Sequence, residues 1–289
     1  MSNALKFSKM HGLGNDYVVI GLFDPVNRKK FGKIRDLKAF AKSVCDRHFG
    51  IGADGILLAA PPMNKNATGS MRIINADGSE AEMCGNGIRC IAKFILDNKY
   101  SRKKELVIET VSGTKVIVAD RVSAVNGLYR VDMGEPHLKR KEIPMNGRMD
   151  ANAVDEPLQL KYKQVKITAV SVGNPHAVLF VDDADFDIEE LGKEVENHPV
   201  FPNRTNVEFV QVLGSGEIEL RVWERGVGET LACGTGACAS VVACVLNNKT
   251  GRKVKVNLKG GELLVEWAKN NHIYMTGPAS FVFSGTIEV

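Results

Sequence analysis

Apolar and polar residues alternate along much of this chain in a way that predicts many short strands and few helices. Apolar residues recur at every second position, or form β-branched runs, between turn-forming residues. The predicted strands are Glu105–Val111, Thr114–Ala119, Leu128–Met133, Lys161–Val172, Val207–Val212, Glu217–Trp223, Lys253–Leu258, Glu262–Trp267 and Phe281–Val289. Lys33–Cys45 is amphipathic, and Asp187–Asn197 is charged as a surface helix would be.

Two further helices are predicted to be buried. Ile88–Asp97 is apolar on most faces, and Arg89 and Lys93 form a narrow polar stripe four residues apart. The segment from Thr230 to Asn248 carries no charge at all. A helix from Gly234 to about residue 247 is shorter than the roughly 20 residues that a bilayer requires, so burial in a protein core is favoured. We therefore expect two lobes, each a curved sheet around one central helix.

Both buried helices follow near-identical glycine loops that begin with a cysteine. The first reads Met83-Cys84-Gly85-Asn86-Gly87-Ile88 and the second reads Ala232-Cys233-Gly234-Thr235-Gly236-Ala237. The pairs that lie twelve, nine and four residues before the cysteines are Arg72 and Arg221, Asn75 and Glu224, and Glu80 and Glu229. Gly14-Asn15-Asp16 likewise has an echo in Gly173-Asn174-Pro175. The chain is therefore predicted to be an internal duplication, with a cleft between two similar lobes.

Composition narrows the class of protein. A length of 289 residues favours about two domains, and 44% hydrophobic residues suffice for a core in each. The net charge is +4, with basic and acidic residues well mixed, so nucleic acid is not expected as a partner. Six cysteines are too few for a disulfide scaffold, and residues 1–10 lack the apolar run of a signal peptide. We expect a cytoplasmic protein with no membrane segment.

The two loops have the chemistry of an acid–base pair. A cysteine at a helix N-terminus feels the positive end of the helix dipole, which favours thiolate over thiol. The first backbone N–H groups of each helix lack intrahelical partners, and the glycines let a ligand approach them closely. Two such helix ends at one cleft would bind a carboxylate or a phosphate. Two sulfurs beside them suggest proton transfer on opposite faces of one substrate atom.

Several motifs resemble those of the diaminopimelate epimerase family, in the same order over essentially the whole chain. The first half contributes Lys9-Met10-His11-Gly12-Leu13-Gly14-Asn15-Asp16 and Asn75-Ala76-Asp77-Gly78-Ser79-Glu80, followed by Cys84-Gly85-Asn86-Gly87-Ile88-Arg89. The second half contributes Gly173-Asn174-Pro175-His176 and Glu224-Arg225-Gly226, followed by Ala232-Cys233-Gly234-Thr235-Gly236.

The resemblance implies an enzyme without cofactor or metal that interconverts LL- and meso-diaminopimelate for lysine and peptidoglycan synthesis. By position, Cys84 and Cys233 match the two catalytic bases, and His176 and Glu224 match residues that tune them. The residues matching substrate contacts are Asn15, Asn75, Gly85, Asn86, Asn174, Asn206, Glu224, Arg225, Gly234 and Thr235.

The resemblance also implies a fold and an assembly. The fold would be α/β (α+β), with two homologous lobes, each a mostly antiparallel curved sheet around a buried helix, and a homodimer as the assembly. Residues 1–128 with 277–289 would form the lobe that carries Cys84, and residues 129–276 would form the lobe that carries Cys233. One departure is visible, because Gly55 stands where some members of the family have a glutamine that contacts substrate.

Other functions have weaker support. A proline-racemase-type enzyme shares the two-cysteine logic, but it typically has histidine at the position of Asn86 and lacks the contexts of Asn75 and Glu224-Arg225. A zinc site from Cys84, Cys90, Cys233 and Cys238 lacks the two-residue spacing of structural sites. A redox protein would be expected to carry a Cys-x-x-Cys motif, which this chain does not have. A binding module without catalysis would not need both sulfurs.

Overall fold

The computed structural model describes residues 4–81, 83–123 and 125–288, and the fold divides into two compact units. Unit 1 comprises Met1–Val131 together with Gly277–Val289, and unit 2 comprises Asp132–Thr276. Both divisions fall inside strands, so that β8 and β17 each contribute residues to both units. Residue 289, the last of the predicted terminal strand, lies outside the described residues.

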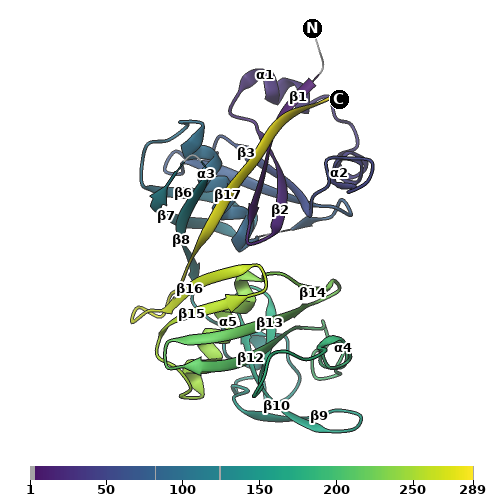
Figure 1. Cartoon of the computed structure of the whole chain (residues 1–289), viewed down its shortest axis with the longest axis vertical. Helices are drawn as coiled ribbons and strands as arrows, with labels where there is room; N and C mark the ends of the chain where they lie inside the picture. Colours follow the sequence, from purple (N-terminus) through teal and green to yellow (C-terminus); the bar gives the residue numbers. More distant parts are fainter. Residues whose placement is uncertain (1–3, 82, 124, 289) are drawn as a thin grey trace. The chain divides into compact units, whose positions relative to one another are not determined.

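Unit 1 is a closed ring of strands, labelled in Figure 1. Its strands are β1 (Ala4–Gly12), β2 (Asn15–Gly21), β3 (Gly55–Ala60), β4 (Gly69–Asn75), β5 (Glu80–Ala81), β6 (Glu105–Thr110), β7 (Gly113–Val122), β8 (Asn126–Gly134) and β17 (Ile273–Glu288). The order β1-β2-β3-β4-β6-β7-β8-β17 returns to β1. Within this ring β2–β3 and β4–β6 pair in parallel, whereas β1–β17, β1–β2, β3–β4, β6–β7 and β7–β8 pair in antiparallel fashion.

Unit 2 repeats this order. Its strands are β9 (Glu156–Gln159), β10 (Gln164–Ser171), β11 (Pro175–Phe180), β12 (Asn206–Gly214), β13 (Glu217–Glu224), β14 (Gly228–Thr230), β15 (Lys253–Leu258), β16 (Gly261–Trp267) and the start of β17. The parallel pairs are β11–β12 and β13–β15, which correspond to β2–β3 and β4–β6. The occurrence of parallel pairs at corresponding places in the two units confirms the duplicated, mostly antiparallel α+β fold predicted from the sequence.

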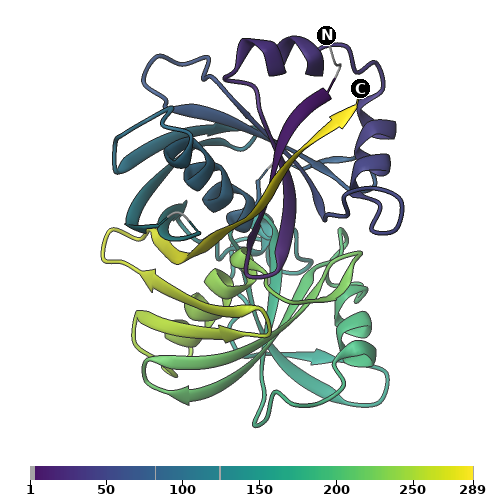
Figure 2. The ribbon, with the colours of Figure 1, turned by 45° about the horizontal axis from the view of Figure 1, so that its top comes forward.

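One helix occupies the centre of each unit. In unit 1, α3 (Gly85–Asp97) has every residue from Gly85 to Ile95 buried. In unit 2, α5 (Gly234–Leu246) is buried over Gly236–Cys244. Figure 2 shows each helix enclosed by the curved strands of its own unit. A helix that is apolar on all faces is buried on all sides. The absence of charged residues in 230–248 predicted this burial for α5.

The polar stripe of α3 is buried together with the rest of the helix. Arg89 and Lys93 are both fully buried. Arg89 donates to the carbonyl oxygens of Pro278 and Gly85, at 3.0 and 2.9 Å. Lys93 donates to the carbonyl oxygen of Ser123 at 2.8 Å. Buried charges are tolerated where they are hydrogen-bonded, and here they tie the helix to its surroundings.

The shorter helices lie outside the sheets. They are α1 (Pro25–Phe31), α2 (Leu37–Cys45), the 3-10 turn η1 (Arg140–Glu142) and α4 (Glu189–Glu196). α2 begins later than the predicted Lys33, because the Asp36 side chain caps it by accepting from the amide of Ala39 at 2.9 Å. α1 was not predicted, although Asp24 caps it in the same way and proline occupies its first turn.

β17 is longer than the predicted strand that started at Phe281. Residues Ile273–Thr276 pair with β16, whereas residues 280–288 pair with β1. Gly277 and Pro278 lie where one partner strand gives way to the other. Among the helices of the described residues, none is long and apolar enough to cross a membrane.

Candidate active site

Cys84 and Cys233 begin the two central helices and have the same local geometry. Each is the N-cap residue, with extended backbone angles, of α3 or α5. Each sulfur accepts a hydrogen bond from the backbone N–H three residues later, of Gly87 or Gly236, at 3.4 Å. The thiol groups therefore hold the place that serine or aspartate usually takes at a helix start. The sequence predicted this placement.

The sulfur of Cys84 lies in a cluster of polar groups from β2 and α3. The Tyr17 hydroxyl is 2.9 Å from Cys84 Sγ, and Asn15 Oδ1 is 3.6 Å from it. Asn86 Nδ2 donates to the same Asn15 oxygen at 3.3 Å. Unit 1 thus brings together three of its predicted site residues, Asn15, Cys84 and Asn86, and adds Tyr17, which the sequence analysis missed.

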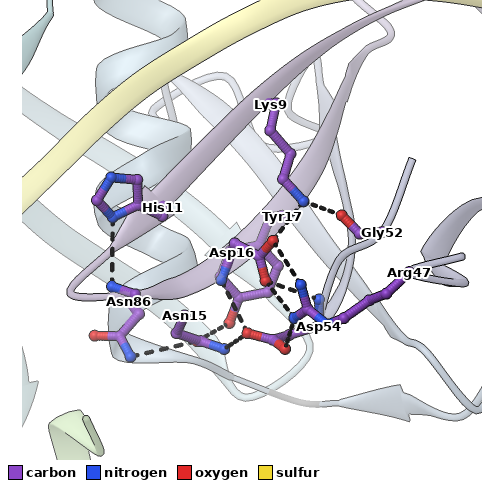
Figure 3. A network of polar contacts seen from close by, with 10 residues as sticks. Lys9, His11, Asn15, Asp16, Tyr17, Arg47, Gly52, Asp54 and Asn86 are labelled. Atoms are coloured by element: carbon purple, nitrogen blue, oxygen red, sulfur yellow. Dashed lines mark hydrogen bonds and ion pairs between the residues drawn. The ribbon is translucent and has the colours of Figure 1, made fainter. Parts of the chain in front are cut away.

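An ionic network fixes the strand that carries Asn15 (Figure 3). Asn15 Nδ2 donates to Asp54 Oδ2 at 2.8 Å, and Arg47 joins Asp54 to Asp16 with contacts of 2.6 and 2.8 Å. Lys9 contacts Asp16 at 2.5 Å and donates to the carbonyl oxygen of Gly52. Burial acts to raise the pKa of Asp16, but hydrogen bonds from Arg47 and Lys9 and the charge of Lys9 outweigh it and lower this pKa to about 2.

The surroundings of Cys233 oppose the thiolate, although the helix end acts to favour it. Burial raises the pKa of the Cys233 thiol well above its ordinary value of 9, and the charges of Glu224 and Glu208 raise it further. Hydrogen bonds from Thr235 and the Gly236 amide act in the other direction and are outweighed. The Thr235 hydroxyl lies 3.4 Å from the sulfur. These surroundings therefore favour the thiol form of Cys233.

His176 lies between two other polar side chains of unit 2. Its Nε2 is 2.9 Å from Asn174 Oδ1, and its Nδ1 is 2.6 Å from Glu208 Oε1. His176 and Glu208 are both fully buried, and a Cβ at residue 236 would lie 2.8 Å from Glu208 Oε1. The pair therefore packs on the first turn of α5, where only glycine fits at 236. Glu208 was not predicted as a site residue.

The remaining predicted residues of unit 2 meet at the ends of β12 and β13. Asn206 Oδ1 accepts from the backbone N–H of Arg225 at 2.9 Å, and Asn206 Nδ2 donates to the Pro175 carbonyl at 2.8 Å. The Arg225 guanidinium donates to the Asn203 carbonyl at 3.0 Å. Glu224 Oε1 accepts from the Thr230 hydroxyl at 2.5 Å.

Two predicted positions of unit 1 have local structural roles. Asn75 ends β4, and its side chain donates to Ser79 Oγ at 3.0 Å within the following turn. Gly55 begins β3, and a Cβ there would lie 2.8 Å from the Ile74 carbonyl oxygen. Ile74 would have to shift before a side chain fitted at 55, so the strand pairing itself favours glycine at this position.

The signal for one of the two missed residues, Tyr17, was present in the repeat. Tyr17 follows Asn15 by two residues, and His176 follows Asn174 by two. The two positions also agree in pairing: Tyr17 is opposite Gly55 in the parallel β2–β3 pair, and His176 is opposite Asn206 in the parallel β11–β12 pair. Extending the repeat by two residues would have identified Tyr17. In the sequence, Glu208 is only an isolated acidic residue between Val207 and Phe209.

The repeated arginine and glutamate residues that lie outside the site form the same ion pair in each unit. Arg72 Nε contacts Glu80 at 2.7 Å, and Arg221 Nε contacts Glu229 at 2.6 Å. Each pair joins two adjacent strands, β4–β5 or β13–β14. In the part of the chain that the structure describes, no cluster of three or more His, Cys, Asp or Glu side chains has a metal-binding arrangement.

Solved structures of similar fold include racemases and isomerases. A probable proline racemase from Agrobacterium radiobacter has a TM-score of 0.70 at 14% identity, with 99% of this chain and 93% of that one covered. A hydroxyproline epimerase from Agrobacterium vitis has a TM-score of 0.69 at 14% identity, with 100% and 94% covered. At such identities the likeness concerns the fold.

Sequence relatives are much nearer. A diaminopimelate epimerase from Pelotomaculum thermopropionicum is 50% identical over 287 residues, covering 97% of this chain and 98% of its own length. Another from Agathobacter rectalis is 49% identical over 297 residues, covering 99% of this chain and 100% of its own. The family model described as diaminopimelate epimerase matches residues 7–139 and 168–282, which include both cysteine-capped helices. The chain belongs to the diaminopimelate epimerase family.

Proposed function

We propose that this protein interconverts LL- and meso-2,6-diaminopimelate by a two-base mechanism. The observation that carries the proposal is the repeated start of α3 and α5, where Cys84 and Cys233 cap glycine-rich turns in the same geometry. One sulfur, as thiolate, removes the proton from the substrate α-carbon. The other, as thiol, delivers a proton to the opposite face, so the configuration inverts. Each sulfur changes role when the reaction runs backwards.

The two sulfurs must together carry one negative charge. A free cysteine has a pKa of about 8.5, so at neutral pH one of the two has to be favoured as thiolate by its surroundings. Burial and the carboxylates of Glu224 and Glu208 raise the pKa of the Cys233 thiol, which suits the role of proton donor. We assign the role of first base to Cys84, which lies beside a hydroxyl and an amide. In this state the enzyme binds the isomer whose α-proton faces Cys84.

The helix ends would stabilise the transition state. Removing the α-proton moves negative charge onto the carboxylate of the reacting end. Backbone N–H groups of Gly85, Asn86, Gly234 and Thr235 occupy the first turns of α3 and α5, where such groups have no intrahelical acceptor. Donors fixed before the reaction stabilise developing charge without reorganising, and exclusion of water strengthens them.

The far end of diaminopimelate would be recognised by the polar residues that do not touch sulfur. It carries a carboxylate and an ammonium group. Arg225 can bind the carboxylate through two parallel N–H groups, and Glu224 can accept from the ammonium group. The amides of Asn75, Asn174 and Asn206 supply neutral donors and acceptors. We also propose that the protein acts as a cytoplasmic homodimer, which light scattering at micromolar concentration would test.

Incubation of the protein with LL-diaminopimelate in D₂O tests the activity directly. We expect the meso isomer to form with deuterium at one α-carbon, because the proton is delivered from a thiol that has exchanged with solvent. Absence of both isomerisation and α-deuteration would refute the proposal. Turnover of L-proline with no reaction of diaminopimelate would instead favour a proline-racemase-type activity. This activity is the second candidate, because solved enzymes of that type have a similar fold.

A further inference from the structure

The Tyr17 hydroxyl contacts the sulfur of Cys84 more closely than Asn15 Oδ1 or the Gly87 amide does. The Tyr17 hydroxyl is 2.9 Å from Sγ, compared with 3.6 Å for Asn15 Oδ1 and 3.4 Å for the Gly87 amide. The ring of Tyr17 is only 4% exposed, so packing fixes the hydroxyl in place. The same position of unit 2 holds His176, which contacts Asn174 and Glu208. The corresponding positions of the two units therefore hold different groups: Tyr17 contacts a cysteine, whereas His176 contacts an amide and a carboxylate.

The hydrogen bonds of Asn15 show where the Tyr17 hydrogen can point. Asn15 Nδ2 donates to Asp54 Oδ2 at 2.8 Å, which places Oδ1 toward Cys84. This carbonyl oxygen accepts only, and it lies within hydrogen-bonding distance of the Tyr17 hydroxyl. The hydroxyl can therefore donate its hydrogen bond to either of two acceptors, Asn15 Oδ1 or Cys84 Sγ. While Cys84 carries its proton, the amide oxygen is the better acceptor.

We propose that Tyr17 is a positioning residue for Cys84, whose hydroxyl hydrogen turns from Asn15 Oδ1 to Sγ when the sulfur becomes a thiolate. A hydrogen bond to an ionised acceptor is roughly twice as strong as one between neutral groups. The turn therefore stabilises the thiolate and directs its lone pair. The role of that thiolate as a base rests on the proposed function, whereas the hydrogen bond itself does not.

The phenol keeps its proton throughout. Burial, followed by the charge of Cys84, raises the pKa of Tyr17 well above its usual value of 10. The proton taken from the substrate carbon ends on Sγ, and the O–H bond of Tyr17 is never broken. Asp54 and Cys90 are the other ionisable groups that act on Tyr17, and Arg89 and Lys93 act with Cys84 on Cys90. Exchanging tyrosine for phenylalanine leaves all of them unchanged.

The chain offers a matched control. Tyr129, on β8 of the same unit, is fully buried, and its hydroxyl makes no hydrogen bond within the described residues. Tyr17→Phe and Tyr129→Phe each remove one buried hydroxyl and leave the ring. The difference between the two variants reports the contact with sulfur.

The test is the pH dependence of Cys84 alkylation by iodoacetamide in the full chain, quantified by mass spectrometry. Trypsin cuts after Arg72 and Arg89, and the peptide 73–89 contains Cys84 as its one cysteine. We expect Tyr17→Phe to raise the midpoint of alkylation by about one pH unit or more, the typical effect of removing a hydrogen bond to a charged group. Tyr129→Phe should leave the midpoint within about 0.2 units.

Epimerase kinetics give a second readout. Below the new midpoint, kcat/KM of Tyr17→Phe should fall about tenfold per unit of the shift, by the same factor in both directions because the equilibrium constant is fixed. The loss should disappear as the pH rises. A purely structural defect would lower activity at every pH.

The outcomes separate this inference from the proposed function. An alkylation midpoint that does not move in folded Tyr17→Phe overturns the inference, whatever happens to activity. A shifted midpoint in a protein without epimerase activity supports the inference and refutes the function. Should Tyr17→Phe not fold, a fluorinated tyrosine at position 17, which is a stronger donor, must lower the midpoint; a midpoint unchanged by it overturns the inference.

Discussion

His176 Nδ1 lies 2.6 Å from Glu208 Oε1, and water reaches neither side chain. Burial raises the pKa of Glu208, while the charge and hydrogen bond of His176 lower it. The 2.9 Å contact of Nε2 with an amide oxygen requires a hydrogen on Nε2, and the contact at Nδ1 requires another hydrogen between nitrogen and carboxylate. The pair therefore holds its protons in a defined arrangement beside the helix that begins at Cys233.

Glu208→Gln should shift the titration of Cys233 to lower pH. The charge of Glu208 is one of the causes that raise the pKa of the Cys233 thiol, and the amide removes it while keeping the shape. We expect alkylation of Cys233, located by fragmentation of its peptide, to begin at lower pH than in the unaltered protein. Glu262→Gln, which removes a well-exposed carboxylate from the same unit, serves as the control. Identical profiles for all three proteins would contradict the assigned role of Glu208.

Cys84→Ala and Cys233→Ala should each abolish epimerisation. Inversion needs a base on one face and an acid on the other, and alanine supplies neither. Cys90→Ala and Cys238→Ala remove fully buried thiols from the same helices and should keep activity, with a loss of about 1 kcal/mol in the free energy of unfolding. The measurement is chiral chromatography of diaminopimelate after incubation. Near-native rates in either of the first two variants would remove the two-base mechanism.

The duplicated ion pairs should differ in their contribution to stability. The Arg72 side chain is 52% exposed and contacts Glu80, whereas that of Arg221 is 12% exposed and also donates to the carbonyl oxygens of Ala184 and Phe186. We expect Arg72→Ala to cost about 0–1 kcal/mol and Arg221→Ala about 2–3 kcal/mol. Urea denaturation of the two variants would show the difference. Equal losses would mean that the carbonyl contacts of Arg221 contribute nothing.

Protonation of the Asp16 carboxylate should make the folded protein less stable in acid. The pKa of Asp16 is lowered from 3.8 to about 2 in the folded protein. A lowered folded pKa gives stability that is complete above the unfolded value and is lost as the pH falls from about 4 through 2. The loss is at most on the order of 2 kcal/mol. Denaturation at several pH values should show a weaker dependence in Asp16→Asn, while the surface variant Asp120→Asn should follow the unaltered protein.

Substrate choice should depend on the distal carboxylate. A site with buried polar groups rejects ligands that leave those groups unpaired, by factors of about 10⁴–10⁵ where the site is built to pair them. Lysine, which lacks the distal carboxylate, should therefore be a very poor substrate, and proline should not react. Arg225→Lys should lose most activity, because an ammonium group cannot reproduce the planar guanidinium fork. Turnover of lysine at rates near those for diaminopimelate would contradict this account.

The sequence predicted the elements whose pattern is set locally. The uncharged stretch at 230–248 predicted α5, and the alternation at 253–258 predicted β15 with the observed bounds. The duplication predicted that both cysteines begin helices, since a shared motif has a shared geometry. These features depend on residues near one another in the chain, and for that reason they could be identified without a structure.

Features that depend on distant partners could not be identified. Gly277 and Pro278 signal a turn, yet β17 continues through them while its partner changes from β16 to β1. The partners of Arg89 and Lys93 could not be identified, because acceptors such as the Pro278 carbonyl lie far away in sequence. The raised pKa of Cys233 similarly depends first on burial and then on Glu224 and Glu208, which belong to β13 and β12.

The division of β17 has a consequence for how the chain folds during synthesis. Unit 2 is continuous from Asp132 to Thr276, so all of its residues are synthesised before residues 280–288, which pair with β1. Unit 1 begins with the first residues but closes its ring only when β17 pairs with β1, with Ala4 opposite Glu288. The part of the chain made first therefore completes its fold last, and until then β1 and β8 expose unpaired edges that a chaperone or a second chain can bind.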